Sequence, residues 1–236
     1  MADTGEILIV IPARGGSKRL PRKNVLPLAG KPLICWTIEA AIKAKLNALI
    51  LVSSDDDEIL SITREYEADG VMAYKRPDEL ATDTASTVDV IKDACNYLIS
   101  KGFNPMTVVL LQPTSPLRGS QDIKSAIDLY IQKNTKDTIV SVCEIEHPTA
   151  WCGVLSEDSL LTGIDFSGRR SQDYTKEYRL NGAIYISDYE HINTLGTFYT
   201  SKVYAHIMNR EKSIDIDDKF DFYLAGLVAE SIFNND

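Results

Sequence analysis

The sequence predicts an α/β protein with a Rossmann-like, mainly parallel sheet flanked by helices. Short apolar runs alternate along the chain with amphipathic helical patterns, the order expected of strand–helix–strand units. The first run, residues 7–11, is apolar at every position, as in strands whose two faces are both buried. The alternation breaks between residues 146 and 179, where turn residues and charges follow no period. We therefore expect one domain with a small irregular insertion.

Apolar spacing and capping residues predict the first two helices. Apolar side chains recur at helical spacing over residues 33–44. Ser54 with Asp57 matches a capping box, and the acidic residues around Asp57 suit the positive end of a helix dipole. This second helix is expected to run to about residue 66.

The same reasoning places the remaining elements. Ser86 with Asp89 begins the third helix, and Gly102 ends it. Further helices are expected over residues 121–133 and 220–233, and strands over residues 48–52, 70–74, 107–111, 139–143, 183–186 and 203–207.

Composition limits the class of protein. With 44% hydrophobic and 25% charged residues, the chain is typical of soluble globular proteins. No apolar run approaches the ~18 residues that span a bilayer, and the acidic start lacks the basic region of a signal peptide, so we expect a cytoplasmic protein that does not enter membranes. The scattered cysteines and isolated histidines predict neither disulfides nor a zinc site. The net charge of −9 argues against non-specific nucleic-acid binding.

Basic residues concentrate near the start of the chain. Residues 7–38 contain six basic and no acidic side chains. The loop at residues 12–24 follows the first strand, at the sheet edge where open α/β sheets bind ligands. Its adjacent glycines, 15 and 16, would let backbone N–H groups face an anion, and Ser17 adds a donor. The bases able to neutralise a triphosphate there are Arg14, Lys18 and Lys23.

This loop matches neither a Walker A motif nor a dinucleotide-binding fingerprint. A solvated basic loop is the alternative to an anion site, because runs of surface charge are common. Charge pattern alone leaves both interpretations open.

The stretch at residues 11–24 resembles the signature of the acylneuraminate cytidylyltransferases, also called CMP-sialic acid synthetases. Further blocks that resemble this family follow in order at residues 76–84, 111–118, 178–185 and 213–217. The resemblance covers nearly the whole chain. It implies a single nucleotidyltransferase domain over residues 1–236, with residues 146–179 as an inserted arm that makes a homodimer.

The resemblance also implies a reaction between CTP and a sialic-acid-type nonulosonic acid. The anomeric hydroxyl of the sugar attacks the α-phosphorus of CTP, pyrophosphate leaves and a CMP-sugar forms. Such a transfer needs in-line positioning and cancellation of phosphate charge. The residues that the resemblance assigns to the nucleotide are Arg14, Gly15, Ser17, Lys18, Lys23, Asn24, Arg76 and Thr87.

Within that set, Lys23 is the candidate for contacting the α-phosphate in the transition state, with Arg14 beside it. Asn24 would lie near the cytosine, although a turn-forming asparagine fits the sequence equally well. Arg76 and Thr87 resemble the cytosine and ribose contacts of the family. Their alternatives are a surface residue at a strand end and a residue of a helix start.

Asp215 and Asp217 are the candidate metal ligands. In extended chain, residues i and i+2 project to one face, as two ligands of one hard cation should. Mg²⁺, with Mn²⁺ as the alternative, would act on the charge of the reacting phosphate and of the leaving pyrophosphate. A solvated acidic turn is the competing interpretation, because Asp218 and Asp221 follow.

The resemblance assigns five residues to the sugar. Gln112 follows a buried strand and offers donors and an acceptor to sugar hydroxyls and amides. Arg179 would bind the sugar carboxylate, with Arg170 assisting. Phe198 and Tyr199 match an aromatic pair that packs against the sugar substituents, although spacing alone would place such a pair in the core.

Departures from the family pattern fall where the sugar should bind. Residues 149–152 lack a lysine that many relatives carry, and Leu180 replaces a usual proline. N-acetylneuraminic acid and legionaminic acid therefore both stay open as the substrate. The alternatives in function are a cytidylyltransferase for another acid sugar, such as pseudaminic acid or Kdo, and a non-catalytic nucleotide-binding regulator on the same fold.

Overall fold

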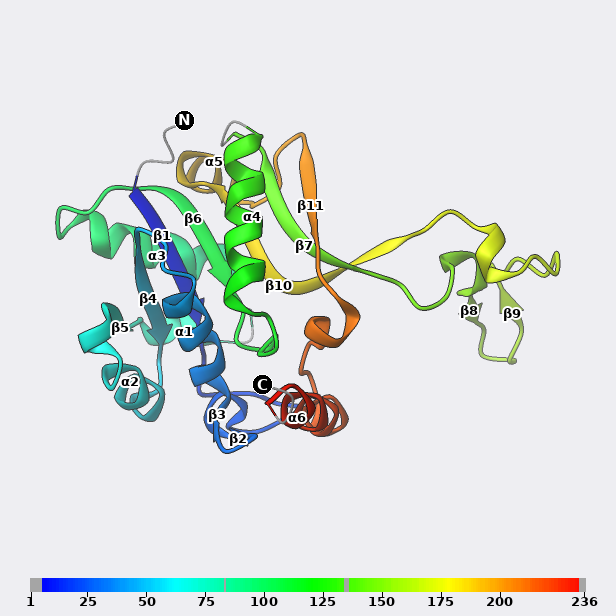
Figure 1. Cartoon of the computed structure of the whole chain (residues 1–236), viewed down its shortest axis with the longest axis horizontal. Helices are drawn as coiled ribbons and strands as arrows, with labels where there is room; N and C mark the ends of the chain where they lie inside the picture. The colour runs from blue at the N-terminus through cyan, green and yellow to red at the C-terminus, as the bar shows by residue number, and fades with distance from the viewer. Residues whose placement is uncertain (1–5, 83, 134–135, 234–236) are drawn as a thin grey trace.

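A seven-stranded sheet forms the centre of the protein (Figure 1). The computed structural model describes residues 6–82, 84–133 and 136–233. The strand order is β11-β7-β10-β6-β1-β4-β5. Strand β10 runs antiparallel to both of its neighbours, and the other pairs of this sheet are parallel, so the predicted mainly parallel α/β fold is confirmed. The strands are β1 (Glu6–Pro12), β4 (Ala48–Ser54), β5 (Val71–Lys75), β6 (Pro105–Leu111), β7 (Thr138–Glu144), β10 (Tyr178–Asp188) and β11 (Val203–Ile207).

Helices cover both faces of the sheet and bury the two sides of its central strand. Ile9 and Ile11 of β1 share a core with α1 and α4 on one face, whereas Leu8 and Val10 share a second core with α3 and α5 on the other. Because successive side chains of a strand point to opposite faces, an entirely apolar β1 satisfies both cores. The helices are α1 (Leu33–Lys43), α2 (Asp57–Arg64), α3 (Thr87–Ile99), α4 (Ser120–Gln132), α5 (Tyr189–Leu195) and α6 (Lys219–Phe233).

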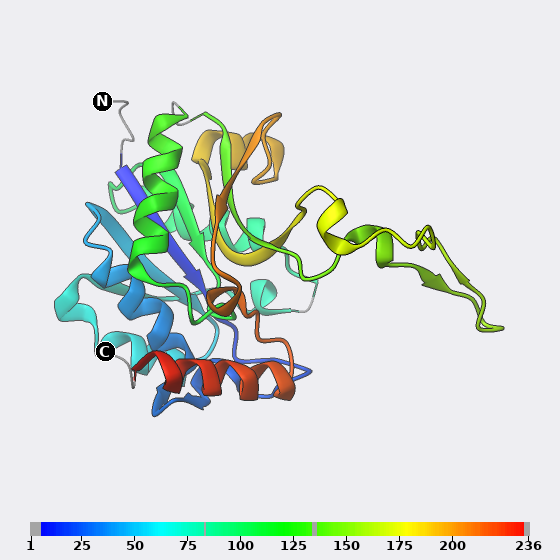
Figure 2. The same ribbon diagram turned by 45° about the vertical axis from the view of Figure 1, so that its right-hand side comes forward.

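Helix α6 lies across one end of the sheet and closes a third, smaller core (Figure 2). Ala225 and Ala229 of α6 pack there with Trp36 of α1 and with Leu28, which belongs to the short hairpin of β2 (Pro27–Leu28) and β3 (Lys31–Pro32). Ile216, fully buried in this core, anchors the segment that leads into α6. No helix in the described part of the chain is long and apolar enough to cross a membrane.

The segment between β7 and β10 projects away from the sheet in both views (Figures 1 and 2). This arm contains the small hairpin of β8 (Val154–Leu155) and β9 (Leu161–Thr162). It exposes several large apolar side chains, among them Val154, which is 73% exposed, and Phe166, which is 76% exposed.

Three local predictions differ from the structure. The N-cap of α2 is Asp56, whose carboxylate accepts from the backbone N–H groups of Glu58 and Ile59, so the expected Ser54–Asp57 box is wrong. Strand β10 extends beyond residues 183–186 in both directions, because its first residues pair with β7 at the base of the arm and its last residues pair with β6. Helix α5 was not predicted, although Asp188 caps its start and Gly196, at φ +67°, ends it. The predicted cap Ser86 does accept from Asp89 N–H at the start of α3.

Candidate active site

A pocket of about 330 Å³ opens at the carboxyl ends of β1 and β6. This is the sheet edge where the sequence placed the ligand. Its walls combine the loop after β1, the end of β5, the start of α3 and the loop after β6. The predicted site residues that line it are Arg14, Ser17, Lys23, Asn24, Arg76, Thr87 and Gln112.

The loop after β1 reaches the pocket through a left-handed turn. Arg22 adopts φ +59° directly before the short 3-10 helix at Lys23–Val25, and this helix buries Lys23 and Asn24. The Asn24 side-chain amide donates to the Arg14 carbonyl at 2.9 Å. Asn24 therefore fulfils the turn-stabilising alternative while also lining the pocket.

Lys23 connects this loop to the acidic segment before α6. Its Nζ donates to the Ile216 carbonyl. Burial lowers the pKa of Lys23, while the negative charges of Asp217 and Asp215 oppose that shift. An ammonium held in this position would meet an anion without needing to reorganise.

Asp215 and Asp217 differ in their surroundings. One carboxylate oxygen of Asp215 is buried without a hydrogen-bond partner among the described residues. Burial raises the pKa of Asp215 and the charge of Asp217 raises it further, while the nearby Thr114 hydroxyl and the charge of Lys23 oppose the shift. Asp217 is 47% exposed and pairs with Arg19 at 3.0 Å. The Asp217 carboxylate therefore already has a cationic partner within the chain.

This pair fits a hard cation that substrate helps to bind. A buried carboxylate oxygen without a donor is the kind of atom that a cation would satisfy. No three His, Cys, Asp or Glu side chains of the described residues gather as a metal-binding group. The remaining ligands would have to be phosphate oxygens and water, which is the usual arrangement for Mg²⁺.

A bulge in β10 brings Gln112 close to Asp215. The pairing of β10 with β7 shifts between Leu180 and Tyr185, and Gly182 adopts φ +74° there. A Cβ at Gly182 would lie 3.3 Å from Asp215 Oδ2 and 3.5 Å from Gln112 Oε1. Only glycine combines this backbone conformation with so close an approach. We did not predict this role, although an Asn-Gly pair within a strand is a signal for it.

Asn181, the residue before this glycine, ties the bulge together. Its Oδ1 accepts from the Ser141 hydroxyl at 2.6 Å, and its Nδ2 donates to the Ser213 Oγ at 2.8 Å. The Ser115 hydroxyl donates to its backbone carbonyl at 3.2 Å. All four residues are almost completely buried. The network therefore fixes the loop after β6 and the start of the 213–217 segment relative to β10.

Two nucleotide candidates of the loop, Gly15 and Lys18, lie outside the pocket lining. The backbone N–H of Gly15 donates to the Asp55 carboxylate, 3.2 Å from Oδ1, and Gly15 does not line the pocket. Lys18 is exposed and also outside the pocket lining. The block at residues 76–84 includes Asp83, which lies outside the described residues.

The sugar candidates are brought together only in part. Arg179 is exposed at the base of the arm, and Arg170 lies in the arm, where it pairs with Asp173. Neither lines the pocket of its own chain. Phe198 is 6% exposed and packs against Tyr185 with ring centroids 5.9 Å apart, as the core alternative predicts. Tyr199 is 46% exposed.

A family model for cytidylyltransferases matches residues 8–209. The chain belongs to the cytidylyltransferase family. It is 38% identical over 93% of its length to an N-acylneuraminate cytidylyltransferase of Escherichia coli, of which it covers 51%. It is 36% identical over 95% of its length to a CMP-N,N'-diacetyllegionaminic acid synthase of Legionella pneumophila, of which it covers 96%. A pseudaminic acid cytidylyltransferase of Campylobacter jejuni is 36% identical over 75% of this chain and 76% of its own. The chain thus spans about half the length of several curated relatives that it matches.

Solved structures share the fold of this cytidylyltransferase. A CMP:2-keto-3-deoxy-manno-octonic acid synthetase complexed with CTP superimposes with a TM-score of 0.72 over 97% of this chain and all of its own, at 16% identity. A 4-diphosphocytidyl-2C-methyl-D-erythritol synthase from Anaerococcus prevotii gives a TM-score of 0.65 over 97% of this chain and 98% of its own, at 15% identity.

Proposed function

We propose that the protein transfers CMP from CTP to the anomeric hydroxyl of a sialic-acid-type nonulosonic acid and releases pyrophosphate. The observation that carries this proposal is the shared pocket of Arg14, Lys23, Arg76 and Gln112, which adjoins Asp215. Basic groups for a triphosphate, a guanidinium for a base and an amide for a sugar thus meet around one cavity. The names of the relatives agree with this chemistry.

The chain's own residues would bind and orient the reactants. Arg14 and Lys23 would neutralise the phosphates, and the buried Lys23 ammonium would stabilise charge that grows around the α-phosphorus as the sugar oxygen attacks. Gln112 would hold a sugar hydroxyl or amide near that phosphorus. The new bond joins the anomeric oxygen to phosphorus, the bond to pyrophosphate breaks, and the hydroxyl proton passes to solvent or to a pyrophosphate oxygen.

Asp215 and Asp217 would hold Mg²⁺, or Mn²⁺ in its place, as the resident cation. When bound, the cation would supply positive charge to phosphate oxygens at the reacting end of CTP. Lys23 and Arg19 partly balance the charge of the two carboxylates. This arrangement favours a cation that enters together with the nucleotide.

A homodimer would complete the sugar side of the site. Arg170 belongs to the arm that projects from the sheet (Figures 1 and 2), and it does not line the pocket of its own chain. The exposed apolar side chains of the arm, such as Phe166, are expected to be buried in an interface, because soluble monomers rarely expose large apolar patches. The arm of a second copy would bury them and could carry Arg170 toward the facing sugar site.

The test is pyrophosphate release from CTP and Mg²⁺ with a panel of nonulosonic acids. N-acetylneuraminic, legionaminic and pseudaminic acids and Kdo would each be offered, with ATP and GTP as nucleotide controls. We expect turnover with CTP and with N-acetylneuraminic or legionaminic acid. Equal turnover with ATP would remove the cytidylyl assignment, and no turnover with any sugar would favour a non-catalytic regulator.

Legionaminic acid is the second candidate substrate. The Legionella relative is matched along 96% of its own length, whereas the E. coli relative is matched along 51%. The departures from the family pattern near the sugar site leave both sugars open as substrate. The ratio of kcat/KM for legionaminic and N-acetylneuraminic acid decides between the two.

A further inference from the structure

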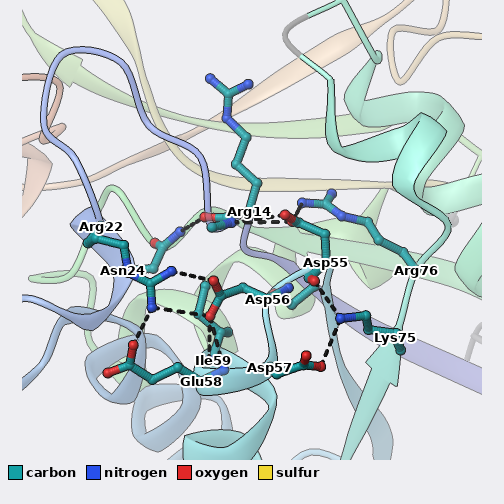
Figure 3. Close-up of polar contacts among 12 residues, drawn as sticks. Arg14, Arg22, Asn24, Asp55, Asp56, Asp57, Glu58, Ile59, Lys75 and Arg76 are labelled. Carbon is teal, nitrogen blue, oxygen red and sulfur yellow. Dashed lines mark hydrogen bonds and ion pairs between the residues drawn. The ribbon is translucent and has the colours of Figure 1, made fainter.

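Acidic residues at the start of α2 face three different bases. Asp56, with Glu58, binds the guanidinium of Arg22, and exposed Asp57 binds Lys75 at 2.8 Å (Figure 3). The remaining acid, Asp55, faces the pocket side. These acidic residues therefore do more than complement the dipole of α2, because their carboxylates form ion pairs with other segments of the chain.

Asp55 joins the two walls of the nucleotide pocket. Its Oδ1 accepts from Arg76 Nη2 at 3.0 Å and from the Gly15 backbone N–H at 3.2 Å. The Arg76 side chain is only 4% exposed and that of Asp55 is 19% exposed. One carboxylate thus fixes the Arg76 guanidinium relative to the loop after β1 (Figure 3).

The other end of this loop also contacts the start of α2. Arg22 is bound by Asp56 and Glu58, and Gly15 packs so closely on Asp56 that an added Cβ would lie 2.5 Å from Asp56 Oδ2. The backbone of the loop is therefore fixed before any ligand enters. Figure 3 shows the Arg14 side chain pointing away from the Asp55 carboxylate.

The chemistry of a guanidinium connects this geometry to base selection. Arginine carries donors only. The pairing edge of cytosine presents two adjacent acceptors, whereas uracil presents an N–H in place of one of them. A guanidinium held still by Asp55 discriminates between the two, but one free to rotate can turn toward the carbonyls of uracil.

We propose that Asp55 is a positioning residue that sets the selectivity for cytosine over uracil by fixing Arg76 against the loop after β1. The inference rests on the proposed use of CTP. It assigns Asp55 no contact with the reacting atoms. Asp55 would instead contribute to nucleotide recognition indirectly, through its hydrogen bonds with Arg76 and Gly15.

The test compares Asp55→Asn with the wild-type protein. Asparagine keeps the size but has no charge, and its single carbonyl oxygen cannot reproduce the charged bonds to both partners. We expect KM for CTP to rise about tenfold or more, as for the loss of one charged hydrogen bond. The ratio of kcat/KM for CTP over UTP should fall by a similar factor. We expect kcat at saturating CTP to stay within about threefold, because Asp55 lies outside the reacting centre.

Asp57→Asn is the matched control. Asp57 lies two residues along the same helix start, is 88% exposed and bonds only Lys75 among the described partners. Its loss removes the same charge from the same helix end without touching Gly15 or Arg76. KM and the CTP over UTP ratio should not change.

Two further variants separate positioning from folding. Asp55→Glu retains the charge and should recover part of the selectivity that Asp55→Asn loses. Adding Asp55→Asn to Arg76→Ala should lower the CTP over UTP ratio no further, because Asp55 acts through Arg76. If Asp55→Asn folds poorly, the ratio of dissociation constants for CTP and UTP, measured by calorimetry at low temperature, replaces kinetics.

The outcomes are distinguishable. A wild-type protein that neither binds nor uses CTP overturns the proposed function. A wild-type protein that prefers CTP, together with an Asp55→Asn variant of unchanged selectivity, overturns only the role of Asp55. An equal loss in Asp57→Asn also overturns it, because the effect would then be general helix-end electrostatics.

Discussion

Burial raises the pKa of Asp215, so we expect the ionised carboxylate to destabilise the folded protein, a cost that its proposed role as a cation ligand would explain. One of its oxygens is buried without a partner among the described residues, and Asp217 adds a second negative charge nearby. Attraction to Lys23 is part of this balance, yet the pKa of Asp215 is still raised by burial. Asp215→Asn keeps the shape and removes the charge. We therefore expect the variant to be more stable and less active.

The magnitude follows from the desolvation of one acceptor. Leaving a buried polar group without a partner costs about 1–3 kcal/mol, and the amide retains part of that cost. We expect a gain of about 1 kcal/mol in the free energy of unfolding, which raises Tm by about 2–4 °C for a chain of this size. Loss of a cation ligand should lower kcat by at least about a hundredfold.

The gain should depend on pH in one direction. A carboxyl group whose folded-state pKa lies above its unfolded value destabilises the fold when ionised. The advantage of Asp215→Asn is therefore complete above the raised folded-state pKa. It disappears as the pH falls through that value to the ordinary aspartate pKa of about 3.9.

The assay is thermal and urea unfolding at pH 7 and pH 4 without divalent cations, followed by the Mg²⁺ dependence of pyrophosphate release. Asp217→Asn is the comparison, because Asp217 is half exposed and pairs with Arg19. It should lose activity without gaining stability. An Asp215→Asn variant with a lower Tm at pH 7, or with wild-type turnover and metal dependence, would refute the reasoning.

Three further outcomes are expected. Gly182→Ala should cost about 1–2 kcal/mol of stability through left-handed backbone strain. It should also lower activity, because the new Cβ would contact Asp215 and Gln112. Gly102→Ala, at φ +89° with open space around it, should lower Tm without lowering activity. Burial lowers the pKa of His206 in the folded protein. As the pH drops below about 6.5, His206 is therefore protonated in the unfolded chain before it is protonated in the folded one, and the free energy of unfolding falls. His206→Gln should flatten that fall in urea titrations. Phe166→Asp in the arm should convert a dimer to a monomer by light scattering, and a wild-type protein that is already monomeric would contradict the proposed assembly.

Part of the site could be predicted because its information is local. The loop after β1, with its glycines and bases, is contiguous in sequence, and its place at a strand end follows from the alternation of apolar runs. Gln112 and the extended Asp215–Asp217 pair were identified for the same reason. Arg14, Ser17, Lys23, Asn24 and Gln112 do line one pocket, and Asp215 lies close to Gln112 beside it.

Other features depend on contacts between segments that the sequence does not pair. From the sequence alone, Asp55 is interpreted as a charge at a helix start. In the structure it accepts hydrogen bonds from Arg76 and Gly15, which follow two other strands. Similarly, an Asn-Gly pair in a sequence suggests a turn, whereas in the structure the Asn181 side chain is hydrogen-bonded to Ser141 and Ser213.

By itself, then, the sequence determined the alternating α/β architecture, the family and the place of the basic loop after the first strand, because periodicity and contiguous motifs encode them. Only the tertiary structure decided that Phe198 is core, that Arg170 lies away from the pocket of its own chain, and that Asp217 already has a partner in Arg19. The physical reason is that the environment of a side chain depends on which distant segments fold against it. Local pattern carries no record of those contacts.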